Sequence, residues 1–189
     1  MTTIPTDLDR SFREAAVAAD LLDAGYDVVD TPIGPLLVAV TDRGLLRVSF
    51  TAGRDPAEEL ESLARVAGPA VLRAPRAVAA AHRELDEYFG GTRRAFDLEV
   101  DLRGQAPFTL RVLDELARVP FGATATYGEL AGRAGRPAAA RAVGMVMNRN
   151  PIPIVLPCHR IVGSNGSLTG YAGGLELKEQ LLRHEGVIL

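Results

Sequence analysis

Cys158 is the only cysteine in this chain of 189 residues, and it lies in the tetrapeptide Pro157-Cys158-His159-Arg160. A thiol beside an imidazole and a guanidinium is a candidate nucleophile, because the thiolate is the reactive form and neighbouring positive charge favours it. A lone cysteine can also be an inert core residue. The surrounding sequence has to decide between these two interpretations.

The segment that leads to Cys158 cannot be helical. Residues 150–157 read NPIPIVLP, and each proline removes a backbone donor and pushes the preceding residue towards extended conformations. We therefore expect Cys158 to lie on a fixed, buried, extended segment. Consecutive side chains of a strand face opposite sides, so proton transfer to His159 needs a local turn or a bridging water, and we expect a water. Arg160 could clamp a phosphate or pair with an acid.

A carboxylate near the end of the chain could orient His159. Residues 175–185 are expected to form the last helix, and they end in Arg183, His184 and Glu185. Cations suit a helix C-terminus, whereas Glu185 opposes the helix dipole, so this acid invites a functional explanation. By accepting the imidazole proton it would hold His159 as a base towards Cys158. A plain surface glutamate is the alternative.

A glycine-rich stretch separates the thiol from this helix. Residues 163–167 read GSNGS and predict a turn, and residues 168–174 read LTGYAGG. Such a loop near the thiol could present backbone N–H groups to a planar ligand, although glycine-rich loops are usually only turns. The glycine spacing does not fit a nucleotide phosphate motif.

Two short helices are expected ahead of the proline-rich segment, at residues 127–134 and 137–147, joined by Gly135-Arg136. Their lengths suit a helix-turn-helix, and a purely structural helical hairpin is the alternative. Residues 127–150 carry four arginines against Glu129, a net charge of +3. This charge favours phosphate contact.

The first half of the chain predicts mixed α and β structure. The turn Asp42-Arg43-Gly44 indicates a hairpin, and Pro107 is suited to begin a helix after a domain boundary near residues 100–106. The apolar stripe of that helix is expected at Phe108, Val112, Leu113 and Leu116. The other expected elements are helices at 8–24, 55–67 and 75–89 and strands at 36–40, 45–50 and 96–102.

The composition is that of an ordinary globular protein, with 47% hydrophobic and 24% charged residues. One cysteine excludes an internal disulfide framework and a multi-cysteine zinc site, and the three histidines lack metal-ligand spacing, so we expect no metal. The first residues resemble neither a secretory signal nor a membrane anchor, which predicts a cytoplasmic protein. The net charge is −6 over residues 1–100 and +3 over residues 101–189. A basic second half is what a duplex-binding face would need.

With these residues in place, the chain resembles the O6-alkylguanine-DNA alkyltransferases, also called methylated-DNA–protein-cysteine methyltransferases. The stretches that carry the resemblance are PFTLRVLDELARVPFGATATYGELA (107–131), RPAAARAVGMVMNRNPIPIVLPCHRIVG (136–163) and LTGYAGGLELKEQLLRHEG (168–186). The first half matches more loosely, through TPIGPLLVAVTDRGL (31–45) and LDEYFGG (85–91). The resemblance implies an α+β protein: a helical extension at 1–25, a ribonuclease H-like α/β domain at 26–103 and a helical domain with a helix-turn-helix at 104–189.

The resemblance also implies roles for the residues around the thiol. Cys158 would accept the alkyl group, His159 would take the thiol proton through water, and Glu185 would orient the imidazole. Tyr127 would donate a hydrogen bond to the guanine ring as negative charge leaves it. Asn150 would brace the turn behind the reactive segment.

Further residues would contact DNA and the damaged base. Arg141 would enter the base stack and hold the space left by a flipped nucleotide. Some family members have serine where this chain has Ala172, so a hydroxyl contact to the base is missing here. The remaining DNA contacts implied are Tyr127, Arg136, Ala139, Ala140 and Gly144, and the base pocket is Ile161, Tyr171 and Ala172, with the backbone of Cys158.

The implied activity is direct-reversal repair: one irreversible transfer per molecule, from O6-alkylguanine or O4-alkylthymine in double-stranded DNA to Cys158. We expect a cytoplasmic monomer with neither cofactor nor metal and no membrane contact. Two rival interpretations remain, a cysteine hydrolase that uses Cys158 and His159, and a damage-sensing DNA-binding module whose cysteine is silent.

Overall fold

The structure is a computed structural model that describes residue 15, residues 21–53 and residues 55–188. It divides into two compact units, Met1–Leu85 with Leu98–Asp101, and Asp86–Asp97 with Leu102–Leu189. The division expected at residues 103 and 104 stays a prediction. Most of the helix expected at 8–24 lies outside the described residues, and its end is wrong, because residues 21–23 are not helical and Ala24 begins a strand.

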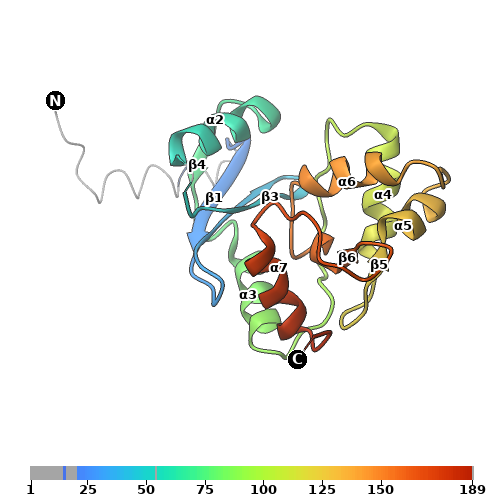
Figure 1. Cartoon of the computed structure of the whole chain (residues 1–189). Coiled ribbons are helices and arrows are strands. Elements are labelled where there is room, and N and C mark those ends of the chain that lie inside the picture. The colour runs from blue at the N-terminus through green and yellow to red at the C-terminus, as the bar shows by residue number, and fades with distance from the viewer. Residues whose placement is uncertain (1–14, 16–20, 54, 189) are drawn as a thin grey trace. The chain divides into compact units, whose positions relative to one another are not determined.

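A sheet forms the centre of the first unit (Figure 1). The strand order is β3-β2-β1-β4, with β4 parallel to β1 and the other neighbours antiparallel. Gly44 closes the predicted hairpin at φ 124°, where an added Cβ would lie 2.3 Å from the carbonyl oxygen of Glu99, so only glycine fits. The strands are β1 (Ala24–Val29), β2 (Leu36–Thr41), β3 (Gly44–Phe50) and β4 (Val71–Arg73).

Two helices accompany this sheet. Helix α2 (Pro56–Ala67) begins where the Asp55 carboxylate accepts a hydrogen bond from the N–H of Ala57, and it buries Leu63 against β2 and β3. Helix α3 (Ala79–Phe89) begins four residues later than expected, because residues 75–78 form a turn after Pro75. The last residues of α3 belong to the second unit.

The strand expected at 96–102 is wrong. The segment makes a single parallel bridge, in which Leu45 donates to the carbonyl of Glu99 and accepts from the N–H of Asp101. Alternation of apolar and polar residues predicted a strand, but a strand needs a partner along its whole length, and here the pairing stops after one residue.

The second unit is mainly helical (Figure 1). Helices α4 (Pro107–Ala117), α5 (Tyr127–Arg133) and α6 (Ala140–Asn148) pack against one another, and α7 (Leu175–His184) follows later in the chain. Pro107 begins α4 as predicted; Val112, Leu113 and Leu116 are buried, and Phe108 is half-buried. Two short parallel strands, β5 (Ala125–Thr126) and β6 (Ile161–Val162), join the start of α5 to the residues after Cys158.

The α5–α6 pair forms the predicted helix-turn-helix with a longer connection. Helix α6 begins three residues after Pro137, because residues 134–139 turn through Gly135 at φ 79° and the N–H of Arg136 bonds back to the carbonyl of Ala131. Thr126 and Glu129 close the start of α5 with a reciprocal capping box. Among the described residues, no helix is both long and apolar enough to cross a membrane.

Candidate alkyl-acceptor site

Cys158 is buried, with 3% of its surface exposed, but it does not lie on an extended segment. It begins a single 3-10 turn, η1 (Cys158–Arg160), in which the N–H of Arg160 bonds to the carbonyl of Pro157. The predicted extended backbone is therefore wrong at the reactive residue. The prolines before Cys158 exclude an α-helix, and the backbone there forms successive tight turns instead of an extended strand.

Asn150 holds these turns together. Its side-chain N–H donates to the carbonyl of Leu156 at 2.7 Å, and its side-chain oxygen accepts from the N–H of Ile152 at 3.1 Å. Between them, Ile154 has φ 76°, the only non-glycine residue at positive φ in the described chain. A β-branched residue rarely adopts this conformation, so the surrounding contacts must impose it. The position of Cys158 thus depends on the Asn150 amide.

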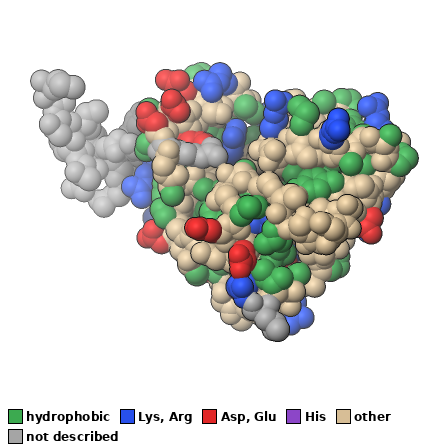
Figure 2. All heavy atoms as spheres, in the orientation of Figure 1, with side chains coloured by type: hydrophobic (Ala, Val, Ile, Leu, Met, Phe, Trp, Pro, Cys, Tyr) green, Lys and Arg blue, Asp and Glu red, His purple; other side chains and the backbone are tan. Residues whose placement is uncertain are grey.

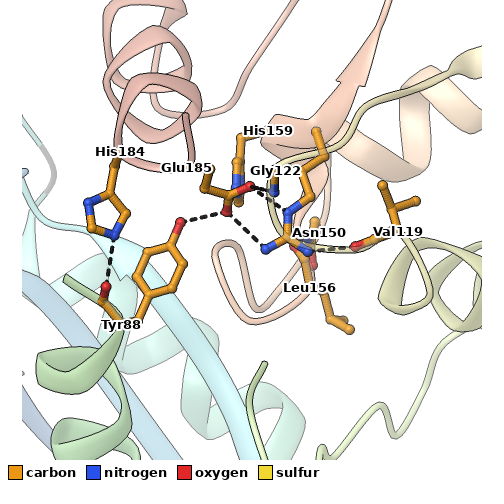
Figure 3. A network of polar contacts seen from close by, with 9 residues as sticks. Tyr88, Val119, Gly122, Asn150, Leu156, His159, His184 and Glu185 are labelled. Carbon is orange, nitrogen blue, oxygen red and sulfur yellow. Dashed lines mark hydrogen bonds and ion pairs between the residues drawn. The ribbon is translucent and has the colours of Figure 1, made fainter. Parts of the chain in front are cut away.

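Three side chains and one backbone N–H meet around one buried carboxylate, that of Glu185 (Figure 3). Its Oε1 lies 2.8 Å from Nε2 of His159 and also accepts from Arg160 and from the hydroxyl of Tyr88. Its Oε2 accepts from Nε of Arg160 and from the N–H of Gly122. The surface-glutamate alternative is therefore wrong, and Arg160 is an ion-pair partner that also donates to the carbonyl of Val119, not a phosphate clamp.

This network fixes the state of the imidazole. Burial alone would raise the pKa of Glu185, but hydrogen bonds from His159 and Arg160 outweigh it and hold that pKa at about 2. An ionised carboxylate has no proton to give, so Nε2 of His159 donates and Nδ1 is the acceptor nitrogen. Burial also lowers the pKa of His159, against the pull of Glu185. Within the described chain, Nδ1 has no hydrogen-bond partner.

The thiol of Cys158 is neutral in this structure. Burial raises its pKa to about 11, while hydrogen bonding with Asn150 and the charge of Lys178 act in the opposite direction. Positive charge near the thiol, that of Lys178, favours the thiolate but does not outweigh burial. The guanidinium of Arg160 is committed to Glu185, and the imidazole is uncharged at neutral pH.

Sequence reasoning missed Lys178, which is fully buried in α7. Its ammonium group donates to the carbonyls of Ile161, at 2.5 Å, and Thr169, at 2.7 Å, and so ties β6 to the glycine-rich loop. Burial lowers its pKa to about 8. Helical spacing could have revealed it, because Lys178 and Glu185 share a face with Leu181 and Leu182 at i, i+3, i+4 and i+7.

A second group of predicted residues surrounds the glycine-rich loop. The hydroxyl of Tyr127, at the start of α5, lies 3.4 Å from the carbonyl oxygen of Thr169. Gly144 faces the same tyrosine, since an added Cβ would lie 3.9 Å from its ring. Burial raises the pKa of Tyr171 well above its usual value. Ile161 is buried and Ala172 is exposed.

The predicted DNA-contacting arginines lie at the surface of the helix-turn-helix. Arg141 is exposed on the first turn of α6, after the half-buried Ala139 and Ala140. Arg136 is exposed in the connection and stacks 5.0 Å from the ring of Phe108. Figure 2 shows Lys and Arg side chains at the surface over α4 and α6. No contact links these arginines to the group around Cys158 among the interactions described.

Metal binding was not expected, and the described residues contain no group of three or more His, Cys, Asp or Glu side chains that could hold a metal ion.

Two family models match the chain, the ribonuclease-like domain of 6-O-methylguanine DNA methyltransferase at residues 25–102 and its DNA-binding domain at residues 107–187. A methylated-DNA–protein-cysteine methyltransferase of Methanosarcina acetivorans is 43% identical over 161 residues, which are 85% of this chain and 97% of that protein. The chain belongs to the 6-O-methylguanine DNA methyltransferase family. Both the family resemblance and the α+β fold expected from the sequence are confirmed.

Solved structures of the same family agree with the fold. The Mycobacterium tuberculosis O6-methylguanine methyltransferase is 38% identical and superposes with a TM-score of 0.75, covering 86% of this chain and 92% of that one. The Mycobacterium tuberculosis OGT in complex with DNA superposes with a TM-score of 0.74 at 38% identity, over 85% of this chain and 92% of that one. The methyltransferase fold therefore extends over both compact units.

Proposed function

We propose that this protein repairs DNA by direct reversal, taking the alkyl group from O6-alkylguanine onto Cys158 in a single irreversible transfer. The observation that carries the proposal is the state of His159, whose Nε2 is committed to the ionised Glu185 while Nδ1 has no hydrogen-bond partner among the described residues. A free acceptor nitrogen next to the sole cysteine is what activation of a buried thiol needs. Family membership supplies the substrate class.

The transfer proceeds in balanced steps. The thiol of Cys158 gives its proton, through a water, to Nδ1 of His159. The sulfur then forms a bond to the methyl carbon as the bond from that carbon to O6 breaks, and the guanine keeps the bonding electron pair. Tyr127 donates a hydrogen bond to the ring as charge develops there, and the guanine takes up one proton. The product is a thioether, which water does not cleave, so each molecule acts once.

Substrate reaches the thiol after base flipping, because the reactive atom is hidden in a stacked duplex. The helix-turn-helix binds double-stranded DNA, and Arg141 fills the space left by the flipped nucleotide. Arg136, Ala139, Ala140 and Gly144 belong to the same surface. Backbone groups of Cys158, Ile161 and Ala172 read the base, beside Tyr171. The protein works without a cofactor, as a monomer in the cytoplasm, and accepts O4-alkylthymine as a second substrate.

The test is the intact mass after incubation with a duplex that contains one O6-methylguanine. We expect one methyl group on the peptide with Cys158, and methyl transfer that stops at one per molecule. Cys158→Ala should keep DNA affinity and take up nothing. An unmodified peptide beside unrepaired DNA would contradict the proposal, and many turnovers would indicate a hydrolase instead. Unchanged behaviour of Cys158→Ala would indicate a damage-sensing module.

Arg141→Ala tests the flipping step separately. Since the side chain would fill the vacated stack, we expect slower repair of duplex DNA with a much smaller loss of binding. Repair rates in single-turnover experiments and affinities by fluorescence anisotropy measure the two effects. Arg133→Ala is the matched control, because Arg133 is an exposed arginine of the neighbouring helix α5. Unchanged repair by Arg141→Ala would contradict the wedge role.

A further inference from the structure

We infer that Tyr88 is a positioning residue for the transfer, because its hydroxyl holds the Glu185 carboxylate in the orientation that fixes the His159 imidazole. The inference deepens the proposed function and rests on it. Tyr88 lies on α3, far in sequence from the motifs around Cys158, and no role was expected for it.

The contact is short and completely buried. The hydroxyl of Tyr88 lies 2.7 Å from Oε1 of Glu185. The same oxygen is hydrogen-bonded to Nε2 of His159 at 2.8 Å. Neither the tyrosine nor the imidazole has any exposed surface. Figure 3 shows the phenol of Tyr88 pointing at the Glu185 carboxylate from the side of α3.

The direction of this hydrogen bond is fixed. Glu185 is ionised and can only accept, so Tyr88 must donate. Burial, and then the negative charge of Glu185, raise the pKa of Tyr88 above its usual value, so the phenol keeps its proton throughout the working pH range. Tyr88 is therefore a permanent neutral donor to the oxygen that orients the base.

The ring of Tyr88 is held in place independently of its hydroxyl. It packs edge-on against Phe89 and Phe121, at centroid distances of 5.1 and 6.1 Å, and against His184 at 4.9 Å. The imidazole of His184 also bonds to the carbonyl oxygen of Tyr88 at 2.8 Å. A phenylalanine can keep this packing, so Tyr88→Phe removes the hydrogen bond alone.

Loss of the hydroxyl has a predictable effect on His159. Oε1 of Glu185 would lose one of its donors, become more basic and stabilise the imidazolium, so the pKa of His159 should rise. The other charged groups that bear on this site are Arg160, whose guanidinium pairs with Glu185, and Lys178, whose charge also lowers the pKa of His159. The backbone N–H of Gly122 also donates a hydrogen bond to Oε2 of Glu185. None of these is altered in Tyr88→Phe.

The first measurement is the rate of methyl transfer in single-turnover reactions over a range of pH. The second is the pH midpoint of His159 ionisation, followed by NMR of the ring nitrogens. For Tyr88→Phe we expect a rate about tenfold lower at its plateau, the effect of one lost hydrogen bond to a charged group. The acidic limb of the pH–rate profile and the His159 midpoint should both move to higher pH. Tyr26→Phe removes the hydroxyl of a tyrosine on β1 of the first unit and should change neither.

A merely structural tyrosine would give a different result. It would lower the folded fraction and the amplitude of the reaction while leaving the His159 midpoint in place, and that outcome would overturn the inference, as would an unchanged rate. If the unaltered protein accepts no methyl group, the proposed function fails, and the NMR midpoint still decides whether Tyr88 controls the imidazole.

Discussion

Cys158 combines low accessibility with a high pKa, which suits a residue that can react only once. A thiolate exposed in the free protein would be consumed by any electrophile or oxidant. Here burial keeps the sulfur protonated, and Nδ1 of His159 has no hydrogen-bond partner among the described residues. The reactive form is therefore produced during the transfer and is not stored.

This state of Cys158 predicts how the free protein reacts with iodoacetamide. Only the thiolate reacts with iodoacetamide, and burial raises the pKa of the Cys158 thiol to about 11. The alkylation rate should therefore be low at neutral pH and should rise towards about pH 11. The rate is measured from the mass of the peptide that contains Cys158. In denaturant the midpoint should return to its ordinary value near 9. A plateau reached near neutral pH in the folded protein would contradict the burial argument.

At the scale of elements, the reactive turn depends on one side chain, that of Asn150. The backbone between Asn150 and Cys158 has no regular hydrogen-bond ladder, and Ile154 occupies a strained conformation. One hydrogen bond that the Asn150 amide donates and one that it accepts replace that ladder. The turn should therefore be sensitive to this one residue.

Asn150→Ala should lower the free energy of unfolding by about 2 kcal/mol, since two hydrogen bonds to partly buried backbone groups are lost. Urea unfolding measures the change, and methyl uptake should slow as Cys158 loses its fixed position. Asn148→Ala, at an exposed position near the end of α6, is the control and should change stability by less than about 0.5 kcal/mol. Equal effects of the two substitutions would show that the amide does not brace the turn.

The start of α5 carries Tyr127 and is fixed by a capping box. Thr126→Ala removes the side-chain oxygen that accepts from the N–H of Glu129, at a cost of about 1 kcal/mol. Because Tyr127 is the first residue of the helix, repair should also slow. Thr124→Ala, two residues earlier and outside the helix, provides the comparison in thermal denaturation. A Thr126→Ala protein as stable as Thr124→Ala would exclude the cap.

Local signals explain which elements could be predicted from the sequence. Pro107 at a helix start and the glycine at position 44 each act within a few residues, and the elements they mark are found. The segment 96–102 depends on a distant partner, and its prediction is wrong. The thiol and imidazole are neighbours in sequence, but Tyr88 and Glu185 are 97 residues apart, and no pattern near either one indicates the contact.

For the whole molecule, Glu185 links catalysis to stability. It receives hydrogen bonds from η1, from α3 and from the segment after α4. Its pKa of about 2 in the folded protein lies below the ordinary 4.5, so the unfolded chain binds more protons between those values. The stability from this carboxylate is fully present above about pH 4.5 and is lost as the pH falls towards 2.

Glu185→Gln should therefore destabilise the protein most at neutral pH, by about 3 kcal/mol from the pKa difference. The gap in free energy of unfolding between the two proteins should narrow between about pH 4.5 and pH 2. Denaturant titrations at a series of pH values measure it. Glu179→Gln is the control, because Glu179 pairs with Arg183 at the surface and should show little change. A gap that stays constant with pH would contradict the shifted pKa.

The long separation between Tyr88 and Glu185 has a consequence during translation. A ribosome adds the phenol, then the sulfur and imidazole, and only 26 residues after His159 the acid that joins them. Until then a nascent chain holds an alkyl acceptor whose base has nothing to orient it. Contacts of such separation also close slowly. The polypeptide therefore becomes competent for the transfer only once Glu185 has been added.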